Sequence, residues 1–105
     1  MSHGNSNRNT KLHHLYEIRD KEEDDVFKYG ISDNHIDNDG LSKRIRRQLI
    51  ILNAAVGWLR FFANILRTDT PGRKKAKRIE QEHIERYKEK HGRKPRGNLK
   101  WIRLF

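Results

Sequence analysis

The sequence contains no cysteine, which excludes a disulfide framework, a cysteine-ligated zinc site and a thiol nucleophile. It is also poor in apolar residues, which make up 33% of the chain, and its mean hydropathy is -1.08. The apolar residues are clustered, so the 105 residues predict one compact domain with a highly charged surface. No stretch is typical of a membrane-spanning helix, because the longest apolar run, residues 49–66, contains Gly57, Arg60 and two asparagines.

Acidic residues are too few to balance the basic ones: 14 Asp and Glu face 24 Lys and Arg, which gives a formal net charge of +10. Residues 1–40 hold 5 basic and 9 acidic residues, whereas residues 41–105 hold 19 basic and 5 acidic residues. Such an excess predicts an anionic partner, most simply nucleic acid, bound by the second part of the chain. No membrane partner is expected.

Two β-prone runs, residues 12–18 and 26–32, are joined by a short polar connector and predict an antiparallel hairpin. Residues 33–40 are dense in turn formers and predict an exposed loop. Residues 1–11 are polar and rich in asparagine, so we expect a flexible lead followed by a single domain over residues 12–105.

A first helix is indicated by apolar residues that recur at spacings of three and four, with Ser42 as a plausible N-cap and Gly57 placed to end it. These apolar residues are Leu41, Ile45, Leu49, Leu52 and Val56. The aromatic and branched residues of 58–67 then favour a short third strand.

A second helix has clear boundary signals, with Thr70 as the predicted N-cap, Pro71 at the first helical position and Gly92 after the last turn. The tail, residues 93–105, ends in an apolar run that could dock back on the sheet.

One carboxylate, Glu80, lies on the face of the second helix that should pack inward. It shares an arc of the helical wheel with Ala76, Ile79, His83, Ile84, Tyr87 and His91, and lies opposite Glu82, Glu85 and Glu89. An unpaired charge in such a place costs roughly several kcal/mol, so Glu80 should meet a cation. A salt bridge to an arginine and a bound metal ion are the two alternatives.

Arg44 and Gln48 are four residues apart and share one side of the first helix, next to its apolar stripe. An arginine held there could present its planar guanidinium to a phosphate. The alternative is a solvated arginine, which is the more common situation for a single residue of this basic segment.

Lys28 interrupts an apolar, β-prone run, and Tyr16 is equally far from the inner end of its own strand. If the connector closes symmetrically, the two side chains face each other across the hairpin on the same side of the sheet. A nearby ammonium would favour the phenolate form of Tyr16, which a general base requires. Simple packing of a lysine stem on an aromatic ring is the alternative.

The stretches "LYEI" and "KYGIS", followed by a helical arginine, a later glutamate and a late "GN", resemble the GIY-YIG (URI-type) endonuclease superfamily. The chain looks most like the URI-type nuclease domains at the C-termini of bacterial polymorphic toxins, over residues 12–99. Tyr16 matches the first tyrosine of the family, and Lys28 stands where classical members have the second. Gln48 stands where many members carry histidine.

The resemblance implies an α+β (mixed α/β) fold with a small three-stranded antiparallel sheet flanked by helices, and metal-dependent phosphodiester hydrolysis. Glu80 would bind Mg²⁺, or another divalent cation such as Mn²⁺. Lys28 would favour the ionised form of Tyr16 or hold the phosphate. The implied catalytic residues are Tyr16, Lys28, Arg44, Glu80 and Asn98, with Tyr29, Gly30 and Gln48 in supporting positions.

The basic segments of the second half are expected to follow a nucleic-acid backbone through Arg47, Arg73, Lys74, Lys75, Lys77 and Arg96. The preferred hypothesis is a DNA-degrading toxin domain of a larger secreted effector, which acts in the cytoplasm of a target bacterium and is neutralised by an acidic immunity protein. An RNA-directed nuclease of the same fold and a non-catalytic basic nucleic-acid-binding module are the alternatives.

Overall fold

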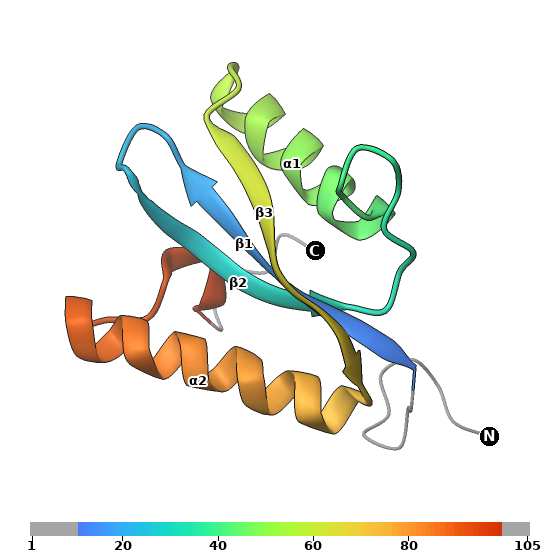
Figure 1. Ribbon diagram of the computed structural model, residues 1–105. Coiled ribbons are helices and arrows are strands. Elements are labelled where there is room, and N and C mark those ends of the chain that lie inside the picture. Colours follow the sequence, from blue (N-terminus) through green and yellow to red (C-terminus); the bar gives the residue numbers. More distant parts are fainter. Residues whose placement is uncertain (1–10, 100–105) are drawn as a thin grey trace.

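The computed structural model describes residues 11–99, and it has an α+β architecture in which two helices lie on opposite sides of a three-stranded antiparallel sheet (Figure 1). The strands are β1 (Leu12–Asp20), β2 (Asp25–Ser32) and β3 (Phe61–Pro71), in the spatial order β2-β1-β3. We predicted a flexible lead over residues 1–11 and docking of the apolar end of the tail, residues 93–105. All of the lead but residue 11, and the apolar end of the tail from residue 100, lie outside the described residues.

The predicted hairpin is confirmed, but its predicted register is wrong. Tyr16 pairs with Gly30, and Lys28 pairs with Ile18. The register shifts between Ile18 and Arg19, so that the pairing skips Phe27. A bulge of this kind adds one residue to one strand and so shifts the pairing beyond it. The prediction assumed a symmetric connector with no extra residue in either strand. Tyr16 and Lys28 are therefore diagonal neighbours rather than direct partners, still on one side of the sheet.

The third strand is also confirmed, but it begins later and runs further than predicted. Thr70 pairs with His13 and Pro71 with Leu12, so both belong to β3 and not to the start of a helix. Proline is tolerated at the end of an edge strand, where its missing N–H leaves no ladder partner unsatisfied. Gly72, with a φ of 87°, then turns the chain into α2 (Arg73–His91).

The first helix, α1 (Lys43–Val56), ends at Gly57 in the left-handed conformation, as predicted. Ser42 occupies the N-cap position, but its side chain caps no backbone N–H and instead lies 3.2 Å from Nε2 of His14. The inner face of α1 supplies Ile45 and Leu52 to the main apolar core, where they meet Tyr16, Ile18, Phe27 and Phe61.

The second helix covers the other face of the sheet and ends at Gly92, as predicted (Figure 1). Its buried residues are Ala76, Ile79, Glu80, Ile84 and Tyr87. The chain then forms a short 3-10 helix, η1 (Arg96–Asn98), which lies against β2. No helix among the described residues is long and apolar enough to cross a membrane. Both α2 and η1 therefore lie against β2, the edge strand that carries Lys28, whereas α1 packs mainly on β3.

Candidate active site

Tyr16 occupies the central strand of the sheet, and its side chain is fully buried. Its neighbour across the hairpin is Gly30. A Cβ atom at position 30 would overlap the Tyr16 ring and its hydroxyl, so the aromatic side chain lies directly against the glycine backbone. Glycine is required here because of this close approach, which places the Tyr16 hydroxyl against the backbone of β2.

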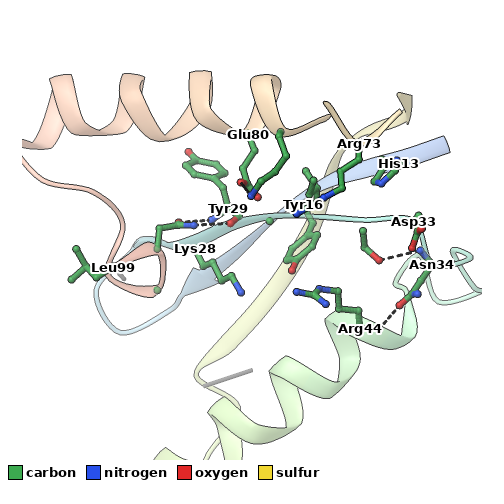
Figure 2. Close-up of a pocket in the computed structure, with 16 residues that line it drawn as sticks. His13, Tyr16, Lys28, Tyr29, Asp33, Asn34, Arg44, Arg73, Glu80 and Leu99 are labelled. Atoms are coloured by element: carbon green, nitrogen blue, oxygen red, sulfur yellow. Dashed lines mark hydrogen bonds and ion pairs between the residues drawn. The ribbon is translucent and has the colours of Figure 1, made fainter. Parts of the chain in front are cut away.

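A pocket of about 380 Å³ extends around the edge strand β2, and its walls come from β1, β2, α1, α2 and η1. Figure 2 shows Tyr16, Lys28 and Arg44 directed toward one another, with Glu80 reaching in from α2. The lining includes four cationic side chains (Lys28, Arg44, Arg73 and Lys77) and two carboxylates (Asp33 and Glu80). The structure thus brings together predicted site residues from five separate elements in one basic cavity.

The side chain of Gln48 connects two of these residues. Its Nε2 lies 2.7 Å from the Tyr16 hydroxyl, and its Oε1 accepts a 2.8 Å hydrogen bond from Lys28 Nζ. Gln48 itself is a buried residue of α1. The amide of Gln48 therefore bridges Tyr16 and Lys28, which are diagonal neighbours and do not face each other directly as the sequence predicted.

The ammonium of Lys28 lies in an environment that disfavours its charge. Burial is the main reason that its pKa falls from 10.5 to about 8, and the positive charges of Arg44 and Lys77 lower it further. The negative charge of Glu80 acts in the opposite direction. A lysine with a lowered pKa in a cleft is typical of a functional site. The pKa of about 8 brings the protonation equilibrium of Lys28 close to physiological pH.

Glu80 is buried as the helical wheel predicted, and its side chain is only 10% exposed. Its partner is a lysine of the same helix, since Lys77 Nζ donates to Glu80 Oε1 at 3.2 Å. Within residues 11–99, no group of three His, Asp or Glu side chains is placed to hold a metal ion. A single carboxylate fits Mg²⁺, which retains water ligands and also binds substrate phosphates, but it does not fit a metal held by protein ligands alone.

Asn98 closes the outer edge of β2 beside the pocket. Its Oδ1 accepts a hydrogen bond from the backbone N–H of Tyr29, and its Nδ2 donates to the Tyr29 carbonyl, both at 2.9 Å. The adjacent Gly97 packs so closely that a Cβ there would lie 2.9 Å from Cβ of Lys28. One side-chain amide thus replaces a missing strand partner and fixes the backbone next to Lys28.

Tyr29 lies on the other side of β2 from Lys28, and its ring centroid is 5.4 Å from that of His83 on α2. Burial is the main cause of the raised pKa of its hydroxyl. Its half-buried ring still contributes to the pocket wall. This position agrees with a packing role for Tyr29 and leaves Lys28 as the polar group of the motif that enters the pocket.

The basic residues expected to contact nucleic acid do not all lie together. Arg73 and Lys77 line the pocket, whereas Lys74, Lys75 and Arg47 are exposed and outside its lining. Arg96 is directed elsewhere, because its Nη2 donates to Oδ2 of the buried Asp20 at 2.6 Å. Arg96 thus has an internal partner, in addition to the nucleic-acid contact that was predicted for it.

Several lining residues were not predicted from the sequence, and the polar ones among them are His13, Ser32, Asp33 and Asn34. Nδ1 of His13 lies 2.8 Å from the carbonyl of Lys11, and Oδ1 of Asn34 accepts from the backbone N–H of Arg44 at 3.1 Å. Asp33 and Asn34 belong to the segment read as a turn-rich loop, where polar residues are expected without any site. Asp33 and Asn34 line the pocket because this loop folds back toward the start of α1, and the sequence alone does not show this.

In a comparison with known protein families, the model of a family described as URI fold toxin 2 (Tox-URI2) matches residues 6–92. The matched segment includes Tyr16, Lys28, Arg44 and Glu80, and it ends before η1 and Asn98. No curated protein and no solved structure gives a significant match to the chain.

Proposed function

The chain belongs to the URI fold toxin 2 family, and from this premise we propose that it is a metal-dependent endonuclease of the GIY-YIG type. The observation that carries the proposal is a single pocket whose lining includes Tyr16, Lys28, Arg44 and Glu80. A hydroxyl, an arginine, a lysine and one carboxylate are the groups that phosphodiester hydrolysis needs for water activation, phosphate binding and cation binding.

The roles follow from the chemistry of each side chain. Arg44 presents its guanidinium to the non-bridging oxygens of the scissile phosphate. Tyr16 orients and deprotonates the attacking water, and Lys28 adds positive charge beside the reacting group. Glu80 would hold Mg²⁺ or Mn²⁺. The ion would neutralise the negative charge that develops on the leaving oxygen.

DNA is the proposed substrate. The chain carries a formal charge of +10, and the pocket lining has four cations against two carboxylates. These positive charges attract the negatively charged phosphate backbone of DNA. Arg73 and Lys77 extend this charge along the first turns of α2, and Lys74, Lys75 and Arg47 add to it on the exposed surface. Contacts of this kind position a nucleic acid without reading its sequence.

The deciding experiment compares the wild-type protein with Glu80→Ala and Glu82→Ala on supercoiled plasmid. Glu82 is exposed and only two residues further along α2, so it is a matched control for loss of one carboxylate. Wild type and Glu82→Ala should cleave plasmid with Mg²⁺ and stop in chelator. Glu80→Ala should lose cleavage while it still binds DNA at low salt.

Three outcomes would contradict parts of this proposal. Metal-dependent cleavage by Glu80→Ala would remove Glu80 from the metal site. Cleavage of RNA in preference to DNA by the same preparation would replace the substrate, because nothing in the pocket is specific for a 2′-hydroxyl. Binding of both polymers without cleavage of either, with any divalent ion, would leave a non-catalytic nucleic-acid-binding module.

As the toxin of a larger secreted effector, the domain would act in the cytoplasm of a target bacterium and would need an inhibitor in the producing cell. An acidic immunity protein fits the basic pocket, because complementary charge favours fast association. Expression in a bacterium should arrest growth, and Tyr16→Phe or Glu80→Ala should relieve the arrest. Arrest that persists in both variants would contradict toxicity through this site.

A further inference from the structure

The side-chain amide of Gln48 is the junction between the two side chains on which the proposed reaction depends. Lys28 and Tyr16 contact opposite ends of this amide, at 2.8 and 2.7 Å. Gln48 is 1% exposed, so bulk water does not compete for either contact. The second hydrogen of Nε2 points to the Arg44 carbonyl, 3.4 Å away.

The direction of these hydrogen bonds is fixed by the chemistry of Lys28. An ammonium group only donates hydrogen bonds, so the amide oxygen of Gln48 must face Lys28. The amide nitrogen then faces Tyr16, and a flip of the amide would set two donors against each other. The Tyr16 hydroxyl oxygen is consequently the acceptor of the bond from Gln48.

A phenol that accepts through its oxygen keeps its own proton for another partner. We infer that Gln48 is a positioning residue which, by donating to the Tyr16 oxygen, directs the Tyr16 proton into the substrate pocket and stabilises the phenolate that remains when this proton leaves. The inference rests on the proposed nuclease function. The Tyr16 proton passes to water in the pocket that Tyr16 lines, and the phenolate oxygen, still held by the Gln48 N–H, then accepts a proton from the attacking water.

A Gln48→Glu variant separates this role from a purely structural one. The introduced carboxylate has nearly the same shape, and it accepts from Lys28 and from the Tyr16 hydroxyl alike, so both contacts persist. The Tyr16 proton, however, now points toward position 48 and away from the pocket. If Gln48 only held the site together, Gln48→Glu would remain active; the inference predicts that kcat falls roughly 10²-fold.

The added negative charge needs its own control. Asn34→Asp places a carboxylate in the wall of the same pocket and keeps the oxygen that accepts from the Arg44 N–H. Repulsion of the phosphate should raise KM in both variants, whereas the large loss of kcat should be confined to Gln48→Glu. Kinetics on a labelled oligonucleotide over a range of substrate concentrations separates the two parameters.

A spectroscopic readout makes the test independent of activity. The intensity ratio of the tyrosine doublet in the Raman spectrum differs between phenols that accept and phenols that donate, and Tyr16→Phe identifies the contribution of Tyr16. Tyr16 should report an acceptor in wild type and a donor in Gln48→Glu.

Gln48→Glu with a kcat within about twofold of wild type, or with an unchanged doublet, would overturn the inference. An inactive wild-type protein would instead refute the nuclease proposal, while the doublet would still test the direction of the bond. If Gln48→Glu does not fold, Gln48→Met takes its place, because it removes the donor without offering an acceptor. A Gln48→Met protein with full kcat would overturn the inference equally.

Discussion

Gly30 and Tyr16 are complementary partners across the β1–β2 ladder, because the Tyr16 ring and hydroxyl occupy the space that a side chain at position 30 would need. Tyr16 has no exposed surface, and its ring belongs to the main apolar core as well as to the pocket wall. The glycine therefore serves the fold and the candidate site through one contact.

Substitution Gly30→Ala should displace the Tyr16 ring, with a loss of roughly 1–3 kcal/mol in the free energy of unfolding and a lower kcat. Denaturant unfolding measures the first effect and plasmid cleavage the second. In a Tyr16→Ala background the ring is absent, so the same Gly30→Ala substitution should cost much less. Equal costs in both backgrounds would show that the glycine is needed for a reason other than contact with Tyr16.

Replacement of Lys28 by Met should abolish cleavage without loss of stability. Below about pH 8 the lysine is protonated in the folded and unfolded states alike, and the folded state bears the cost of burying the charge. Between about pH 8 and the unfolded value of 10.5, only the folded state has lost the proton. The contribution of Lys28 to the free energy of unfolding therefore rises with pH across this window, and Lys28→Met should lack this rise.

Urea unfolding of wild type and Lys28→Met at about pH 7 and about pH 10 measures the difference directly. The raised pKa values of Tyr29 and Tyr87 affect both proteins alike, so they cancel in the comparison. Full cleavage by Lys28→Met would mean that Lys28 is a packing residue at the sheet edge. A parallel pH dependence of the two proteins would show that the buried ammonium is not destabilised.

Local patterns of the sequence predicted the elements of this fold well. The three-and-four spacing of apolar residues located α1, and the glycines at positions 57 and 92 ended both helices in the left-handed conformation as expected. The helical wheel placed Glu80 on the buried face of α2 because this depends only on helix geometry. Each of these features is determined by residues within a few turns of one another.

Features set by distant contacts were not predictable in the same way. The start of α2 was misplaced because Thr70 pairs with His13, and this strand pairing overrides the N-cap signal. The register of the hairpin depends on a bulge that no turn motif announces. The bridging role of Gln48 required α1 to be placed over β1 and β2, which the spacing of residues within α1 does not specify.

Asn98 should be essential for the order of the β2 edge next to Lys28. In Asn98→Asp, one oxygen still accepts from the Tyr29 N–H, but the second faces the Tyr29 carbonyl, to which the amide donated before. Two acceptors in contact should cost about 1–3 kcal/mol and should open the strand edge. Hydrogen exchange at the Tyr29 amide, followed by NMR, reports this opening.

The matched control for this prediction is Asn38→Asp, which makes the same chemical change in the exposed loop between β2 and α1. Its effect on the Tyr29 amide and on the free energy of unfolding should be within about 0.5 kcal/mol of zero. Protection of the Tyr29 amide that is unchanged in Asn98→Asp would mean that η1 does not hold the strand through this amide.

Asp20 should contribute more to stability than any exposed carboxylate of the hairpin. Its fully buried side chain receives two 2.7 Å hydrogen bonds from Arg60, just before β3, and one of 2.6 Å from Arg96 of η1. The bond from Arg60 is the main reason that the pKa of Asp20 lies well below its usual range, although burial opposes the shift. Asp20→Asn removes the buried counter-charge of both guanidinium groups, of which Arg60 keeps only the exposed Glu22, and should cost about 3–5 kcal/mol.

The pH dependence identifies the source of this cost. Because the folded pKa of Asp20 is depressed, its stabilisation is complete above the unfolded value of 3.8 and is lost as the pH falls toward the folded value. The difference between wild type and Asp20→Asn should therefore shrink below about pH 4. Asp24→Asn is the control, because Asp24 is fully exposed and lies 3.9 Å from Arg19. A similar loss in both variants would mean that the buried cluster does not anchor η1, and with it Asn98, beside the pocket.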